Sequence, residues 1–157
     1  MTFAARYLFP FVHEDLQQLT GMVPRVLDYP RPDAEFRDVL GTSKKGGGLA
    51  LATSLLHSYF TGDTRDWSKV DAMVTCETGG IVFASPLATR ADIPLVIIRD
   101  AWKLPQPTLS ITKSSSYITS LAANGSKEKW IEMEQDAVRS CSSVVVVDDV
   151  ISTGKTL

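Results

Sequence analysis

Four consecutive valines, Val144–Val147, are followed directly by two aspartates, Asp148 and Asp149. A short apolar run of β-branched residues without polar alternation is typical of a parallel strand whose two faces are both covered. Parallel strands need long crossover connections, and these usually contain a helix. This one segment therefore favours an α/β fold, with a parallel sheet flanked by helices.

Similar runs recur along the chain and predict alternating strands and helices. The expected strands are 72–76, 94–99 and 144–147, and the expected helices are 14–20, 49–59 and 80–90. Residues 27–40, rich in Pro and Asp, are expected to be irregular. Residues 100–129 are rich in Ser, Thr, Pro and Lys with weak periodicity, which predicts a long loop serving as a functional lid or remaining disordered.

Composition limits the classes of protein to which the chain can belong. Apolar residues make up 44% of 157 residues, enough for a single domain over 1–157. A net charge of -2 provides no basic field for nucleic acid or an anionic membrane. No apolar run approaches the roughly 20 residues that span a bilayer, we identify no signal peptide, and Cys76 and Cys141 are too far apart to suggest a disulfide framework or a zinc site. We therefore expect a cytoplasmic protein that binds small molecules.

The residues after the valine run suit a sugar phosphate. Open α/β sheets bind ligands beyond the carboxyl ends of their strands. Asp148 and Asp149 can accept hydrogen bonds from two adjacent sugar hydroxyls, and Gly154 allows the main chain to approach a phosphate closely. Hydroxyl donors in the same turn are Ser152, Thr153 and Thr156. The segment can thus bind both the hydroxyls and the phosphate of a ribose 5-phosphate.

These motifs allow two other interpretations. Two aspartates alone would more simply end a strand and cap a turn, although the whole string is more specific. Residues 154–156 resemble the end of a nucleoside-triphosphate loop, but that pattern needs a glycine where Asp149 stands. The glycine-rich stretch 41–48 also lacks the required lysine and hydroxyl residue, so neither stretch is a triphosphate loop.

Residues 144–157 resemble the phosphoribosyl pyrophosphate signature of the type I phosphoribosyltransferases. From about residue 27 onward the chain is similar to the adenine-specific branch of that family. Further matches occur in the family's order at 28–30 with 36–38, at 103–109, and at 131–133 with 136–137. The resemblance implies an N-terminal hood region (1–45), a flexible lid loop (100–129) and a phosphoribosyl pyrophosphate-binding segment (144–157). It also implies a last helix and strand that would follow Leu157, so we expect the chain to be short at its C-terminus.

The resemblance implies purine salvage: adenine and phosphoribosyl pyrophosphate would give AMP and pyrophosphate, with magnesium as cofactor and a homodimer as the assembly. Tyr117, Asp148 and Asp149 are implied to be catalytic. The residues implied to bind substrate are Phe36 and Arg37 at the base; Glu77, Thr78, Arg99 and Lys103 at the pyrophosphate; Asp148 and Asp149 at the ribose; and Ser152, Thr153, Gly154, Lys155 and Thr156 at the 5-phosphate. Direct metal ligands from the protein are not implied.

Four departures from the family pattern leave alternatives open. Ser116 stands where an acidic residue usually precedes the lid tyrosine, Gly79 replaces an arginine, and Asp100 replaces a basic residue. The lid also has extra residues around 121–129. A catalytically silent nucleotide-binding or regulatory relative, or an enzyme for another base, therefore remains an alternative. Judged alone, Phe36 would equally be a core aromatic, and Arg99 and Lys103 would be solvated charges.

Overall fold

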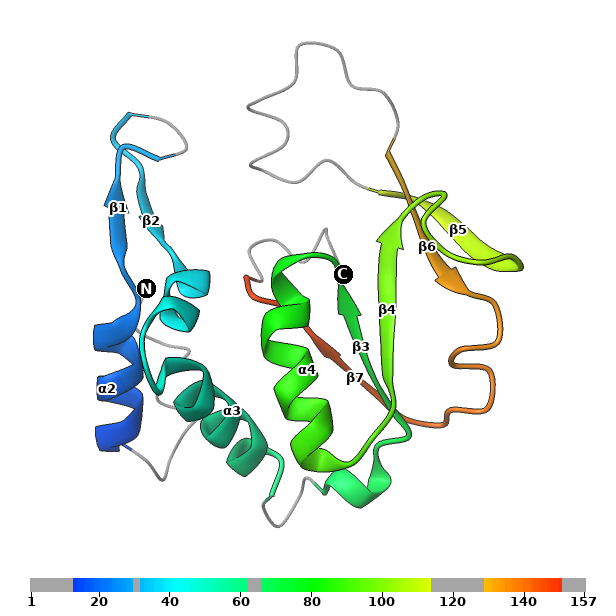
Figure 1. The fold of residues 1–157 in the computed structure, drawn as a ribbon, viewed down its shortest axis with the longest axis horizontal. Helices are drawn as coiled ribbons and strands as arrows, with labels where there is room; N and C mark the ends of the chain where they lie inside the picture. Colours follow the sequence, from blue (N-terminus) through cyan, green and yellow to red (C-terminus); the bar gives the residue numbers. More distant parts are fainter. Residues whose placement is uncertain (1–12, 30–31, 62–65, 114–128, 151–157) are drawn as a thin grey trace.

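The structure is a computed structural model that describes residues 13–29, 32–61, 66–113 and 129–150 (Figure 1). Several predicted residues lie outside these ranges: Ser116 and Tyr117 of the lid, and Ser152, Thr153, Gly154, Lys155 and Thr156 of the phosphate turn. Within the described ranges, none of the helices has the length and apolar character needed to cross a membrane.

Three neighbouring parallel strands form one side of the sheet, and all three were predicted. They are β3 (Ala72–Cys76), β4 (Leu95–Asp100) and β7 (Val144–Val147). In the register, Thr75 of β3 lies beside Ile97 of β4 and Val147 of β7. The strands therefore end at the same edge of the sheet, where residues distant in sequence come together.

Two further strands extend the predicted parallel sheet through antiparallel pairing, so that the whole sheet is mixed. β5 (Thr108–Lys113) pairs with β6 (Lys129–Glu134), and β6 pairs with β4, giving the order β5-β6-β4-β3-β7. The range 100–129 is therefore not a loop throughout. Leu109 and Ile111 alternate with polar residues and pair with Met133 and Ile131 of β6. This period of two was obscured by the abundant Ser and Thr residues.

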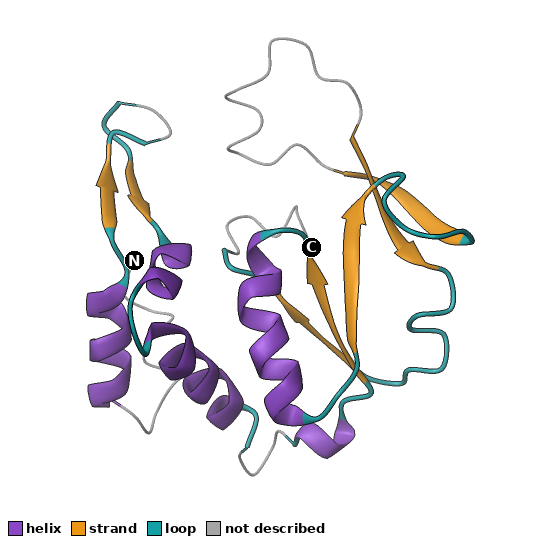
Figure 2. Cartoon of the chain, in the orientation of Figure 1, coloured by secondary structure: helices purple, strands orange, loops and turns teal. Residues whose placement is uncertain are grey.

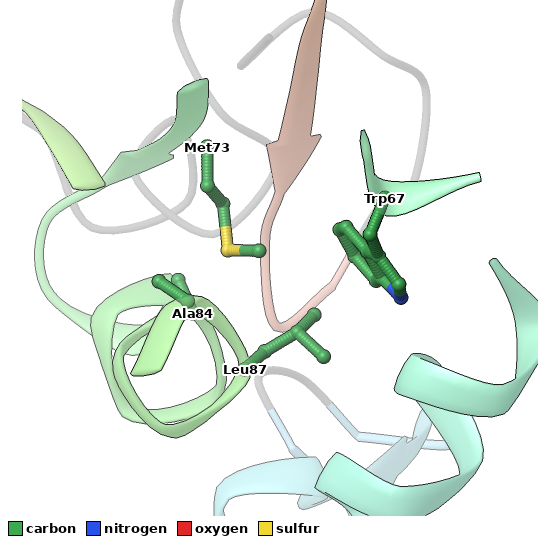
Figure 3. Packing of buried hydrophobic residues seen from close by; sticks show 5 residues of the cluster. Trp67, Met73, Ala84 and Leu87 are labelled. Atoms are coloured by element: carbon green, nitrogen blue, oxygen red, sulfur yellow. The ribbon is translucent and has the colours of Figure 1, made fainter. Parts of the chain in front are cut away.

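One helix covers a face of the parallel strands, and a second helix packs on the first. α4 (Gly79–Ala91) covers β3, and α3 (Gly48–Tyr59) packs on α4 (Figures 1 and 2). In the core between β3 and α4, Met73 and Leu87 are 0% and 2% exposed and lie beside Ala84 and Trp67 (Figure 3). Trp67, in the 3-10 turn η2 (Trp67–Lys69), also donates its indole N–H to the carbonyl of His57 at 3.0 Å. These contacts fix the position of β3, whose carboxyl end lies at the candidate site described below.

The N-terminal part stands on the other side of α3 from the sheet (Figure 1). It consists of α2 (His13–Met22), β1 (Arg25–Leu27), β2 (Glu35–Arg37) and the 3-10 helix η1 (Val39–Lys44). The two strands form an antiparallel hairpin in which Val26 lies opposite Phe36. The expectation that 27–40 is irregular was therefore wrong at β2 and η1, because strands of three residues are too short to show a periodic pattern.

Candidate functional site

The carboxyl edge of the parallel strands gathers polar residues from three parts of the chain. Glu77 directly follows β3, Arg99 lies at the end of β4, and Asp148 directly follows β7. The ladder continues to this edge, since the Glu77 amide donates to the carbonyl of Ile98 at 2.9 Å. The predicted pyrophosphate and ribose residues therefore share one edge of one sheet, where open α/β sheets bind their ligands.

Glu77 is the centre of an ion-pair cluster at this edge. Its carboxylate accepts hydrogen bonds from Arg99 Nε at 3.0 Å, from Lys103 Nζ at 2.5 Å and from the Asp100 amide at 2.8 Å. Its side chain is only 12% exposed. This burial opposes ionisation, but the bonds from Lys103, Asp100 and Arg99 outweigh it and lower the pKa of Glu77 to about 2. Glu77 is therefore a carboxylate at neutral pH, and it fixes two cations.

The two cations keep surface available for a ligand. The side chains of Arg99 and Lys103 are 39% and 44% exposed. Arg99 Nη1 donates to the Lys103 carbonyl at 3.3 Å, which holds the intervening turn against the strand end. The hydrogen bond that Lys103 donates to the Glu77 carboxylate raises the pKa of Lys103, so its ammonium group stays charged. An anion such as pyrophosphate can approach both groups from the exposed side.

The aspartate pair lies against the first turn of α4. A side chain at Gly79 would place its Cβ 2.4 Å from Asp149 Oδ2, and one at Gly80 would place it 3.0 Å from Asp148 Oδ1. Gly79 and Gly80 are absent from the positive-φ residues of the described chain, so they are required by close approach rather than by a left-handed backbone. The Asp149 amide donates to Asp148 Oδ1 at 3.0 Å. The two carboxylates therefore lie beside Gly79 and Gly80 at the start of α4.

Thr78 occupies the N-cap position of α4 without a side-chain cap hydrogen bond. The amide groups of a first helical turn have no partner within the helix, so they can bind an anion. Thr78 and the two glycines thus give this end of the site a backbone surface that suits a phosphate. In the described part of the chain, no three His, Cys, Asp or Glu side chains are placed so as to hold a metal ion by themselves.

The predicted base-binding residues lie on the hairpin. Phe36 is half-buried and packs edge-on against Tyr29, with ring centroids 5.2 Å apart. Arg37 Nε lies 2.9 Å from Glu35 Oε1, and Arg25 pairs with the same carboxylate. Because side chains alternate along a strand, Arg37 and Phe36 point to opposite faces of the hairpin. The structure therefore does not bring Arg37 to the face that carries Phe36.

Sequence reasoning missed two buried polar residues beside the site. Glu132, only 4% exposed, accepts from the Trp102 amide at 3.0 Å and from Ser110 Oγ at 3.2 Å, and so supports the turn that carries Lys103. Thr75 is fully buried in β3, below the glycines of α4. For Thr75 a signal was available, a polar residue interrupting an otherwise apolar strand, whereas the strand of Glu132 contains other charged residues and gives no such signal.

Comparison with known proteins identifies relatives for nearly the whole chain. The profile of the family described as Phosphoribosyl transferase domain matches residues 47–157. An adenine phosphoribosyltransferase of Roseiflexus castenholzii is 33% identical over 139 residues, covering 88% of this chain and 73% of the relative. The crystal structure of the enzyme of that name from Rhodothermus marinus superposes with a TM-score of 0.68 at 28% identity, covering 90% of this chain and 73% of its own.

A third relative has its ligands described. The Saccharomyces cerevisiae adenine phosphoribosyltransferase, complexed with an imino-altritol bisphosphate and adenine, gives a TM-score of 0.70 at 25% identity. The match covers 90% of this chain and 75% of the yeast chain. The fold described above, including its hairpin and mixed sheet, is therefore similar to that of these solved structures.

Proposed function

This chain belongs to the phosphoribosyl transferase domain family, and from that membership we propose that it converts adenine and phosphoribosyl pyrophosphate to AMP and pyrophosphate. Relatives bearing the name of that enzyme are about 30% identical over most of the chain. The observation that carries the proposal is the meeting of Glu77, Arg99 and Lys103 with the Asp148–Asp149 pair at one edge of the sheet. Cations for a pyrophosphate and acceptors for a ribose are thus supplied side by side.

The proposed reaction is a displacement at C1 of the ribose. A ring nitrogen of the purine forms the new bond to C1, the bond from C1 to the pyrophosphate oxygen breaks, and that oxygen keeps the electron pair. The ring nitrogen then releases its proton. Arg99 and Lys103 stabilise the charge that develops on the leaving group, while Asp148 and Asp149 hold the ribose hydroxyls and favour a cationic sugar.

Magnesium fits this site as a companion of the substrate. The carboxylates of Asp148 and Asp149 are hard oxygen ligands, whereas the described residues form no three-ligand cage. Sites of this kind bind magnesium through one or two carboxylates together with substrate phosphates. When bound, the ion would supply neutralisation of the pyrophosphate charge. The chain's own residues would then hold the ribose and the remaining phosphate oxygens.

The outer parts of the proposed site rest on the resemblance to the family. Phe36 would stack on the base, with Arg37 near it after a change of its present pairing with Glu35. Ser152–Thr156 would bind the 5-phosphate through backbone amides and hydroxyls. Tyr117 would close over the substrates from the lid. We propose these roles for the substrate-bound protein.

We also propose a cytoplasmic homodimer. Cys76 and Cys141 are not joined in a disulfide, as is usual in a reducing compartment. Val144 and Val146 are 43% and 45% exposed on the edge strand β7, and such apolar side chains favour contact with another chain. Sedimentation of the purified protein over a range of concentrations tests the dimer directly.

The activity is tested by incubating the purified chain with adenine, phosphoribosyl pyrophosphate and magnesium, and measuring AMP and pyrophosphate. We expect equal amounts of both products, and loss of turnover by at least about 1,000-fold in the D148N/D149N double variant. Retained turnover in that variant would contradict the proposed roles of the aspartates.

A panel of other purine bases, tested in the same assay, separates adenine from other substrates. Turnover with another base and none with adenine would change the assigned substrate but not the reaction. The second candidate, a silent binding protein, is favoured by one observation: Glu77 and Asp100 already pair with the cations that would bind pyrophosphate. Calorimetric binding of phosphoribosyl pyrophosphate without formation of AMP would support it.

A further inference from the structure

Thr75 is a buried polar residue that the proposed reaction leaves without a role. It lies in β3 and is 0% exposed, and its hydroxyl oxygen has no hydrogen-bond partner in the described structure. Its neighbours in the strand, Val74 and Cys76, are apolar. A buried hydroxyl without a partner destabilises a folded protein, so its presence calls for an explanation.

Valine at this position would avoid that cost. Valine has the same branched shape as threonine, and both residues suit a strand. β7, which lies beside β3, consists entirely of valine. Packing and strand propensity would therefore be met equally well by an apolar side chain. The hydroxyl itself is what distinguishes Thr75, and its use must be sought among its neighbours.

The Thr75 hydroxyl oxygen lies near Asp148, beside Gly80. A Cβ placed on Gly80 would lie 2.4 Å from Thr75 Oγ1, 3.0 Å from Asp148 Oδ1 and 3.0 Å from the carbonyl oxygen of Val147. These three oxygens therefore surround one point at the start of α4. Because Thr75 is fully buried, a ligand cannot touch its hydroxyl, which must act through a neighbouring group.

Among these neighbours, the Asp148 carboxylate is the best hydrogen-bond acceptor for the Thr75 hydroxyl. A carboxylate accepts several hydrogen bonds, and a bond to an ionised acceptor is stronger than a neutral one. Asp148 Oδ1 already accepts from the Asp149 amide, and the carboxylate has further acceptor positions. A threonine hydroxyl can turn to any acceptor within reach. A rotation of the Asp148 side chain towards Thr75 would let its carboxylate accept from this hydroxyl as well.

We propose that Thr75 is a positioning residue for Asp148. In the ligand-bound protein its hydroxyl donates to the Asp148 carboxylate and fixes the rotamer in which that carboxylate faces the ribose hydroxyls. The inference rests on the proposed function, since it assigns Asp148 to the ribose. It adds a residue that never touches the substrate but sets the affinity for its sugar.

The test compares T75V, which removes the hydroxyl at constant shape, with T75S, which keeps it. T53V is the matched control, because Thr53 is also buried but donates to the Leu49 carbonyl within α3. Each protein is titrated calorimetrically with ribose 5-phosphate and with phosphoribosyl pyrophosphate plus magnesium. Urea unfolding and the KM values for both substrates are measured on the same samples.

We expect T75V to unfold at the same or a higher urea concentration than wild type, yet to bind both phosphoribosyl ligands about tenfold more weakly. Its KM for adenine should not change. T75S should bind both ligands as tightly as wild type. T53V should be less stable than wild type but should bind both ligands with unchanged affinity. An affinity of T75V within about twofold of wild type would overturn the proposal, as would a loss of stability and affinity that T75S does not restore.

The same titrations separate this inference from the proposed function. Wild-type protein that binds ribose 5-phosphate but forms no AMP contradicts the enzymatic activity, while the comparison of T75V with T75S still decides the role of Thr75. Wild-type protein that binds neither ribose 5-phosphate nor phosphoribosyl pyrophosphate overturns both.

Discussion

Two glutamates in different regions of the molecule each hold two cationic side chains. Glu77, at the edge of the sheet, binds Arg99 and Lys103. Glu35, in the N-terminal hairpin, binds Arg25 and Arg37. The chemistry is nearly the same, but the side chain of Glu77 is 12% exposed and that of Glu35 is 36% exposed. The two clusters therefore differ in burial rather than in the kinds of residue that they contain.

The Glu77 cluster is assembled by the sheet. Its partners follow 22 and 26 residues later in the sequence, and the Asp100 amide adds a third bond. Glu35 instead receives its bonds within one hairpin, where the bond from Arg25 is the main cause of its lowered pKa. The comparison teaches that the proposed phosphoribosyl end of the site is preorganised by the fold. The proposed base end depends on a local hairpin that can adapt.

Replacing the two glutamates is expected to give the largest difference between the regions. E77Q keeps the shape of the side chain but releases Arg99 and Lys103, and a small misplacement of such groups lowers kcat/KM by about 100-fold. E35Q should leave kcat/KM close to the wild-type value, because exposed ion pairs contribute little. Steady-state kinetics with varied phosphoribosyl pyrophosphate measures both.

Equal losses in E77Q and E35Q would show that the hairpin is as preorganised as the sheet edge. Circular dichroism of both variants controls for unfolding. If E77Q is folded and fully active, Arg99 and Lys103 do not need Glu77 to reach the leaving group. Preorganisation of the sheet edge by Glu77 would then be contradicted.

Acid stability should distinguish the same two residues. The pKa of Glu77 is lowered to about 2 from an ordinary value of 4.5, so its contribution to stability is complete above pH 4.5. As the pH falls from 4.5 towards 2, the unfolded chain takes up the proton first and that contribution is lost. In E77Q the unfolding free energy should therefore fall less steeply over this range than in wild type. E35Q should keep most of the wild-type slope, and urea unfolding at several pH values measures all three.

Arginine replacements test the regions from the side of the cations. R99Q removes a charged donor from the proposed pyrophosphate surface and should weaken binding of inorganic pyrophosphate by roughly 10- to 100-fold. R37Q is the matched control in the hairpin, and its pyrophosphate affinity should equal that of wild type. Calorimetry in low salt measures both, since salt screens exposed charges. A similar loss in both variants would indicate a general charge effect.

Phe36 tests the hairpin on its own proposed substrate. F36L removes an aromatic surface while keeping an apolar side chain, and loss of base stacking should raise the KM for adenine about tenfold. The KM for phosphoribosyl pyrophosphate should not change. L27A is the control, because Leu27 is 67% exposed and its partner in the hairpin is Glu35 rather than Phe36. An unchanged adenine KM in F36L would remove Phe36 from the base site.

The central strands and the position of the site could be predicted from sequence because their signals are local and strong. The apolar runs at Ala72–Cys76 and Val144–Val147 predict strands, and the pairing of β3 with β7 fixes where Asp148 must lie. The expectation that both faces of the valine strand are covered was wrong, because β7 lies at the sheet edge with Val144 and Val146 43% and 45% exposed. The prediction that polar residues gather at the carboxyl edge followed from topology alone.

Other features depend on contacts that no local pattern announces. β5 was missed because its pairing with β6 is long-range, and Ser and Thr are as common in loops as in edge strands. The substrate-binding role of Glu77 stays a prediction, but its pairing with Arg99 and Lys103 could not be foreseen from the sequence. The need for glycine at 79 was likewise invisible, since it arises from the approach of Asp149.

The smallest expected effect concerns the backbone of the two regions. Both contain residues with positive φ: Asp33 at 63° in the hairpin, and Trp102 at 69° in the turn that carries Lys103. Aspartate tolerates this conformation, and the Asp33 amide donates to Asp28 Oδ1 at 2.9 Å, whereas a bulky aromatic residue is strained in it. The Trp102 side chain is 88% exposed, so packing offsets little of that strain.

W102G should therefore raise the unfolding free energy by about 0.5–1 kcal/mol, with D33G close to wild type, because glycine relieves a real strain only in the first case. Urea unfolding of the two variants beside wild type measures the difference. The Trp102 amide would still donate to Glu132, so Lys103 should keep its place and the KM for phosphoribosyl pyrophosphate should hold. A less stable W102G would mean that the indole makes stabilising contacts despite its exposure. A stable W102G with a raised KM would show instead that strain in this turn helps to hold Lys103 against Glu77, so that preorganisation of the sheet edge extends to its backbone.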